Sequence, residues 1–89
     1  METILFKSKE QKTAQEAAAA LRQIAEKLEG GQISLKRGEK EVILQVPANL
    51  VLEMKVEEEQ KGQQVEKKLE IEMEWIEGGP QKNEPVAIN

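Results

Sequence analysis

The stretch that most constrains the fold runs from Leu69 to Trp75, where apolar and acidic residues alternate without interruption. Successive side chains of a β-strand point to opposite faces, so this alternation predicts a half-buried strand. Its apolar face carries Leu69, Ile71, Met73 and Trp75, and its other face carries three glutamates. Strands with one apolar and one polar face are typical of antiparallel sheets.

Residues 50–57 supply the expected partner strand. When Val56 pairs with Leu69, Lys55 lies opposite Glu70. A shift by two residues would instead oppose Lys55 to Lys68, and like charges directly opposite are unfavourable. We therefore predict the first register, with residues 61–64 as the loop. This register also opposes Met54 to Ile71, Leu52 to Met73, Leu50 to Trp75 and Glu57 to Lys68.

Two further strands, residues 33–37 and 41–46, are expected to form an earlier hairpin. Gly38-Glu39 between them suits a two-residue type II′ turn. This turn opposes Leu35 to Val42, Ile33 to Leu44 and Lys36 to Glu41. Pro47-Ala48-Asn49 suits a three-residue hairpin loop, which would join the two hairpins by opposing Leu44 to Leu52 and Val42 to Met54.

An amphipathic helix is predicted from about Ala14 to Glu29. Thr13 and Glu16 have the spacing of a capping box, and apolar residues then recur at three- and four-residue steps. Gly30 is expected to take the left-handed conformation that closes a helix. Before the helix, residues 2–8 have the pattern of a first strand.

The element order of strand, helix and four strands predicts an α+β fold. One amphipathic helix would pack on one face of a mainly antiparallel five-stranded sheet. The predicted domain spans residues 1–77, and residues 78–89 are predicted to form a flexible tail. One helix, about 10 Å wide, cannot cover five strands spaced about 4.8 Å apart. Part of the apolar sheet face should therefore need another cover.

Composition excludes several kinds of chemistry. The 89 residues include no cysteine, histidine, aspartate or tyrosine, and the net charge is −4. Disulfides, thiolate nucleophiles and zinc-type sites are excluded, and nucleic-acid binding is disfavoured by charge. The sequence shows no signal peptide and no apolar run of membrane-spanning length, so we expect a cytoplasmic protein without membrane contact. We expect no cofactor and no enzymatic activity.

Residues 18–31, the Val46-Pro47 turn and residues 69–75 together resemble the amphi-Trp domain. This family comprises small bacterial and archaeal proteins named for an amphipathic strand that ends in tryptophan. The resemblance covers about residues 2–76 and leaves out the tail. It implies a single small domain and supplies no catalytic residues.

The outer-face glutamates are candidate ligands of a hard cation. Carboxylates of Glu70, Glu72 and Glu74 lie about 7 Å apart along one face of a strand, too far for neighbours to chelate one ion well. A solvated sheet face is the favoured interpretation, and no metal site is predicted. Trp75 is interpreted mainly as a core residue and alternatively as an exposed anchor for a partner.

The leading functional hypothesis is a small interaction or assembly module that acts through the sheet face or a strand edge. Its expected partner is a second copy of the chain or an unidentified protein. The alternative hypothesis is a pocket for a small apolar ligand between helix and sheet, lined by Leu28, Ile33, Leu52 and Met73. The candidate interaction surface consists of Leu50, Leu52, Met54, Ile71, Met73 and Trp75.

Overall fold

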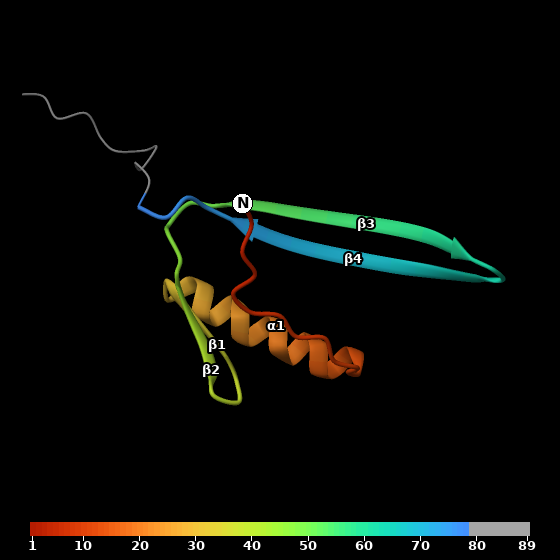
Figure 1. Cartoon of the computed structure of the whole chain (residues 1–89), viewed down its shortest axis with the longest axis horizontal. Helices are drawn as coiled ribbons and strands as arrows, with labels where there is room; N and C mark the ends of the chain where they lie inside the picture. Colours follow the sequence, from red (N-terminus) through yellow and green to blue (C-terminus); the bar gives the residue numbers. More distant parts are fainter. Residues whose placement is uncertain (79–89) are drawn as a thin grey trace, which may run out of the picture. The chain divides into compact units, whose positions relative to one another are not determined.

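The computed structural model describes residues 1–78, which contain one helix and two antiparallel hairpins (Figure 1). The fold is therefore α+β, as predicted. The chain divides into two units, the first spanning Met1–Ala48 and the second beginning at Asn49. The elements are α1 (Ala14–Glu29), β1 (Gln32–Arg37), β2 (Lys40–Gln45), β3 (Val51–Lys61) and β4 (Gln64–Glu74).

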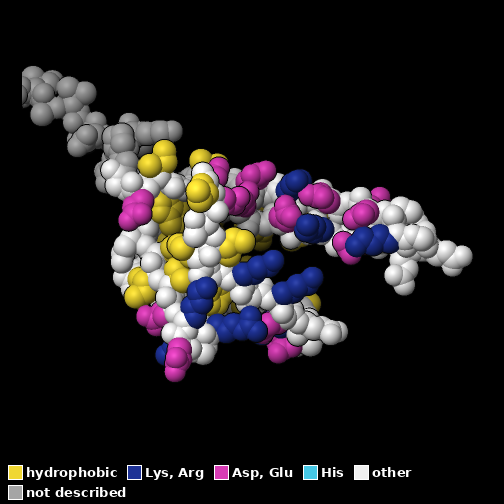
Figure 2. All heavy atoms as spheres, in the orientation of Figure 1, with side chains coloured by type: hydrophobic (Ala, Val, Ile, Leu, Met, Phe, Trp, Pro, Cys, Tyr) yellow, Lys and Arg dark blue, Asp and Glu magenta, His cyan; other side chains and the backbone are white. Residues whose placement is uncertain are grey.

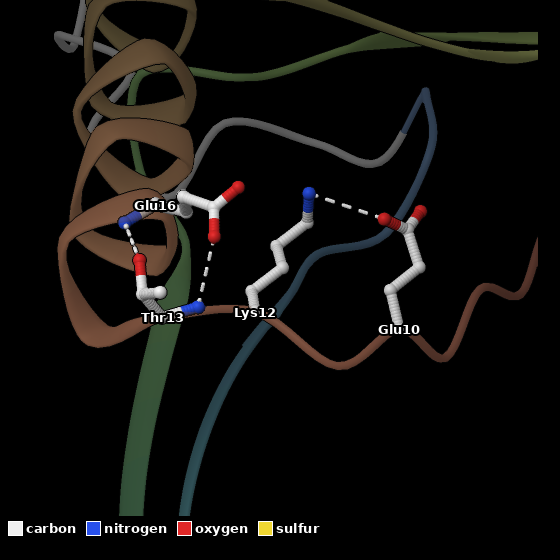
Figure 3. Close-up of polar contacts among 4 residues, drawn as sticks. All are labelled: Glu10, Lys12, Thr13 and Glu16. Carbon is white, nitrogen blue, oxygen red and sulfur yellow. Dashed lines mark hydrogen bonds and ion pairs between the residues drawn. The ribbon is translucent and has the colours of Figure 1, made fainter.

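The predicted capping box begins α1 (Figure 3). The Glu16 backbone N–H donates to the Thr13 hydroxyl at 3.1 Å, and the Thr13 N–H donates to the Glu16 carboxylate at 3.0 Å. Two donors that an uncapped helix would leave without partners are thus satisfied. Just before the helix, the Lys12 ammonium lies 3.1 Å from the Glu10 carboxylate. The helix bounds match the prediction.

The end of α1 differs from the prediction by one residue. Gly30 keeps a right-handed φ of −79°, and Gly31 takes the left-handed φ of +82°. The Gly30 N–H still reaches the carbonyl of Glu26 at 3.2 Å, which continues the helical ladder by one step. The reversal therefore falls on Gly31, whose carbonyl accepts a hydrogen bond from Val46 at 2.8 Å.

The first hairpin has the predicted register and forms part of a small core with α1. Ile33 lies opposite Leu44, and Leu35 lies opposite Val42. Its turn has a positive φ at Gly38 and a negative one at Glu39, which is the sign pattern of a type II′ turn. α1 contacts β1, and Ile33 is buried with only 7% of its surface exposed. The half-buried apolar residues around this core are Ala18, Ile24, Leu28, Leu35, Val42, Leu44 and Val46.

The second hairpin also has the predicted register, and its strands are longer than expected. Val56 lies opposite Leu69, and pairing continues without a break to Lys61 and Gln64. The loop is therefore Gly62-Gln63 alone, whereas residues 61–64 had been expected to form it. Gly62 has a φ of +61°, a conformation that glycine adopts without strain.

The predicted five-stranded sheet is wrong. The four strands form two separate two-stranded sheets, β1–β2 and β3–β4. A three-residue hairpin loop at Pro47-Ala48-Asn49 would need a left-handed third residue, but no non-glycine residue among residues 1–78 has a positive φ. Residues 46–50 therefore link the two units without pairing β2 to β3.

The predicted first strand, residues 2–8, is also absent. This segment has no regular secondary structure, although Phe6 is half-buried. A strand has no hydrogen bonds of its own and forms only where a sheet edge accepts it, so an apolar pattern is a weak predictor of an isolated strand.

Two further predictions concern the tail and membrane-spanning segments. Apart from Gly78, the predicted tail at residues 78–89 lies outside the described residues. Within residues 1–78, no helix combines the length and the apolar content needed to cross a membrane.

Candidate functional site

The candidate site is the β3–β4 hairpin, which has one apolar and one charged face. We call its apolar face, formed by six side chains that oppose one another in pairs, the apolar hairpin face. The pairs are Leu52 with Met73, Met54 with Ile71 and Val56 with Leu69. Four of the six predicted interaction residues, Leu52, Met54, Ile71 and Met73, therefore share this face.

The other two predicted residues lie beyond the paired strands. Pairing ends at Val51 and Glu74, so the expected pair of Leu50 with Trp75 is not part of the ladder. Both side chains are half-buried. Val56 and Leu69 extend the face toward the loop instead, and their position followed from the register that the sequence predicted.

The apolar hairpin face is largely open to solvent. Met54 is 66% exposed, Leu69 67% and Val56 74%. Met73 is half-buried, whereas Leu52 and Ile71 are exposed. Five of the six apolar side chains on these adjacent strands are thus exposed, and contiguous exposed apolar patches mark sites of interaction.

The charged face carries, in the middle of the hairpin, an alternating quartet of Lys55, Glu57, Lys68 and Glu70. Each lysine lies opposite a glutamate, as predicted. The ion pairs themselves run along the strands: Lys55 Nζ is 2.8 Å from Glu57 Oε1, and Lys68 Nζ is 3.1 Å from Glu70 Oε1. Hydrogen bonding within these pairs, followed by their charge, raises the pKa of both lysines and lowers that of Glu57.

The same face is acidic toward the end of the hairpin that is distant from the loop. Glu53 lies directly opposite Glu72, and Glu70 and Glu74 are the next glutamates on that side of β4. A hydrogen bond to Glu53, and then the charges of Glu53 and Glu74, raise the pKa of Glu72. Within the described part of the chain, no three acidic side chains are grouped so that they could hold a metal ion.

Beyond the apolar hairpin face, the hairpin continues toward its loop with charged residues of both signs (Figure 2). Glu58 and Lys67 form an ion pair across the strands, and Lys61 Nζ lies 3.0 Å from Glu66 Oε2. Gln60 donates a side-chain hydrogen bond to the Gly62 carbonyl at 2.9 Å. These contacts surround the loop with polar groups and leave the apolar patch in the half of the hairpin distant from the loop.

A hollow lies between α1 and β1. It is open to solvent, and charged as well as apolar residues line it. Of the four residues expected around an apolar ligand, Ile33 is among its lining residues, whereas Leu28, Leu52 and Met73 are not. The complete lining is Ala20, Gln23, Ile24, Glu26, Lys27, Ile33, Ser34 and Leu35.

Comparison with known proteins identifies the family. No curated protein and no solved structure matches the chain. The family model of the Amphi-Trp domain matches residues 1–89, which includes the tail that the sequence resemblance had left out. Since this match extends over the whole chain, the protein belongs to the Amphi-Trp domain family.

Proposed function

We propose that this protein is a small, non-enzymatic interaction or assembly module and that the β3–β4 hairpin is its interaction element. The observation that carries the proposal is the apolar hairpin face, whose six side chains oppose one another in pairs and are mostly exposed. An isolated two-stranded hairpin is marginally stable in water. Association would supply the additional strands or cover that such a hairpin needs.

The free edges of the hairpin support the same proposal. Among residues 1–78, β3 and β4 pair only with each other, so each has one edge without a strand partner. Each strand is 11 residues long. A long unpaired edge can accept another strand through backbone hydrogen bonds.

The alternative function, binding of a small apolar ligand, has less support. Such ligands occupy concave sites that enclose most of their surface. The hollow between α1 and β1 is open and includes Glu26 and Lys27 in its lining. We also propose that the protein acts in the cytoplasm without a cofactor, and this part of the proposal rests on composition.

The proposal is tested by measuring association of wild type, Met54→Asp and Ile43→Asp. Met54 and Ile43 are both exposed apolar strand residues, but Ile43 lies in the other hairpin. We expect the wild type to associate with itself or to capture a specific protein from its native host. Met54→Asp should lose this association, whereas Ile43→Asp should keep it.

Light scattering at tens of micromolar and affinity purification with mass spectrometry provide the two measurements. A wild-type monomer that also captures no protein would refute the proposal. Equal association of the two variants would show that the hairpin is not the interaction element.

A further inference from the structure

The backbone of β3 is arranged to accept another strand along the edge facing away from β4. In a two-residue hairpin loop the flanking pair, here Lys61 and Gln64, is hydrogen-bonded. Hydrogen-bonded and non-hydrogen-bonded pairs then alternate along the ladder. This alternation directs the backbone N–H and C=O groups of Leu52, Met54 and Val56 toward the free edge.

From this edge and its side-chain pattern we infer that two copies of the chain pair β3 with β3 about a two-fold axis at Met54, forming one four-stranded antiparallel sheet. The inference rests on the proposed function and specifies its partner as a second copy. β1 and β2 are each six residues long, so their edges are shorter than the edge of β3, which has 11 residues. The outward groups of Leu52, Met54 and Val56 would form up to about six backbone hydrogen bonds between copies.

Side-chain complementarity selects this register. A two-fold axis perpendicular to the sheet preserves its faces, so apolar residues of β3 must oppose residues of the same face. With Met54 on the axis, Leu52 lies opposite Val56 of the second copy, and Met54 lies opposite its own counterpart. On the charged face, Glu53 lies opposite Lys55 in both directions. Val51 and Glu57 form the remaining opposed pair.

Other two-fold registers of β3 are less favourable. Centring the pair on Lys55 opposes the two copies of that lysine, and centring it on Val56 opposes Glu53 to Glu59. Centres at residues 53, 57, 58 and 59 each oppose a glutamate to its own copy. Among registers that oppose at least five residues of β3, the Met54 register is thus the one without opposed like charges.

The β4 edge does not offer an equivalent solution. A centre at Leu69 opposes Glu66 to Glu72, and a centre at Ile71 opposes Glu70 to Glu72. The remaining centres between residues 66 and 72 each place a lysine or a glutamate opposite its own copy. Like charges on an edge discourage strand pairing. The charge pattern therefore favours a closed dimer through β3 and protects β4.

The resulting sheet has consistent rows on both faces. The apolar hairpin faces of the two copies join into one surface, with a central row of Ile71, Met54 and their counterparts. On the charged side, each Lys55 lies between Glu70 of its own chain and Glu53 of the second copy. The Lys55 ammonium of the second copy thus lies near Glu53, which is opposite another carboxylate, Glu72, within the hairpin. Four strands also meet the size at which a sheet becomes independently stable.

Cysteine cross-linking tests the register directly, because the chain contains no native cysteine. In Met54→Cys the two cysteines face each other across a hydrogen-bonded pair, whose Cα atoms are about 5.5 Å apart and within reach of a disulfide. In the control Ile71→Cys, three strand spacings separate the cysteines by about 14 Å. Under mild oxidation of the full chain, we expect a covalent dimer from Met54→Cys and little from Ile71→Cys.

Charge reversal tests the complementarity. In Lys55→Glu, the Glu53 side chain of each copy lies opposite a glutamate of the other copy. This variant should weaken the dimerisation constant on the order of tenfold, measured by sedimentation equilibrium. Adding Glu53→Lys restores opposite charges between copies and should restore the dimer. The control is Lys68→Glu. Like Lys55→Glu, it places two glutamates opposite each other within the hairpin, here at positions 57 and 68. Because residue 68 does not face the second copy, this variant should leave dimerisation unchanged.

These outcomes separate the inference from the proposed function. A dimer whose cross-linking shows no preference for position 54, as face-to-face stacking predicts, overturns the β3 register and leaves the interaction module standing. Failure of the double variant to restore the dimer also overturns the register. A monomeric wild type that captures a different protein overturns self-pairing alone, whereas a monomer without any partner overturns both.

Discussion

At the scale of single residues, Glu72 shows how the charged face responds to pH. It lies opposite Glu53, whose hydrogen bond and charge raise the pKa of Glu72 above its ordinary value of 4.5. The folded hairpin therefore holds this proton more tightly than the unfolded chain does. Between pH 4.5 and the raised pKa, the contribution of Glu72 to stability increases as the pH falls and is lost as it rises.

We predict that acidification from neutral pH toward 4.5 stabilises the wild-type hairpin and that Glu72→Gln weakens this dependence. Amide hydrogen exchange in β3 and β4 at several pH values is the measurement. Below pH 4.5 the trend reverses, because the pKa of Glu57 is lowered by its hydrogen bond to Lys55 and this stabilising interaction is lost when Glu57 is protonated. An unchanged pH profile in Glu72→Gln would contradict the assignment.

Ile33 is the second informative residue, because it is the one buried apolar residue among residues 1–78. We predict that Ile33→Ala destabilises the first unit by roughly 2–3 kcal/mol through lost burial and an unfilled space. Ile43, in the same hairpin and 52% exposed, is the control, and its change to alanine should cost less than about 1 kcal/mol. Urea denaturation followed by circular dichroism distinguishes the two, and equal effects would contradict the position of the core.

At the scale of secondary-structure elements, local chemistry determines where α1 begins. We predict that Thr13→Ala destabilises the helix by about 1 kcal/mol, because the Glu16 N–H loses its acceptor. Thr13→Ser retains a hydroxyl and should retain most of the helix content measured by far-UV circular dichroism. If serine and alanine behaved alike, the cap would have no energetic role.

The β3–β4 loop makes an equally local demand. Gly62 has a φ of +61°, which an L-residue with a Cβ adopts only with strain. We predict that Gly62→Ala destabilises the hairpin by about 1 kcal/mol, measured by hydrogen exchange of its amides. Gly30→Ala is the control, since φ is −79° there and the added Cβ would make only ordinary contacts. Loss of protection confined to Gly30→Ala would be inconsistent with this explanation.

At the scale of the whole molecule, the apolar surface exceeds what the described residues bury. A small domain buries a limited fraction of its surface, and a second copy is one way to increase it. If the β3-paired dimer forms, the apparent melting temperature should rise when the protein concentration increases about tenfold, because association stabilises the folded chain. The rise should be smaller for Lys55→Glu. Concentration-independent melting of the wild type would contradict a dimer coupled to folding.

Features that depend on neighbours along the chain could be predicted from the amino-acid sequence. Thr13 and Glu16 specify the start of α1, and the match of apolar and charged residues specifies both hairpin registers. Two-residue turns at Gly38 and Gly62 bring these partners together at little entropic cost. For the same reason, four of the six predicted interaction residues were found on the apolar hairpin face.

How these elements associate could not be predicted from the sequence and is known from the folded structure. The sequence pattern of residues 2–8 suits a strand, yet no strand edge among the described residues pairs with it. Leu44 and Leu52 could oppose each other in principle, but the backbone at Asn49 does not make the required turn. Alternation defines which face of a strand is apolar and leaves its cover and its edge partner undefined, because hydrophobic contact is non-directional and a free edge accepts any compatible strand.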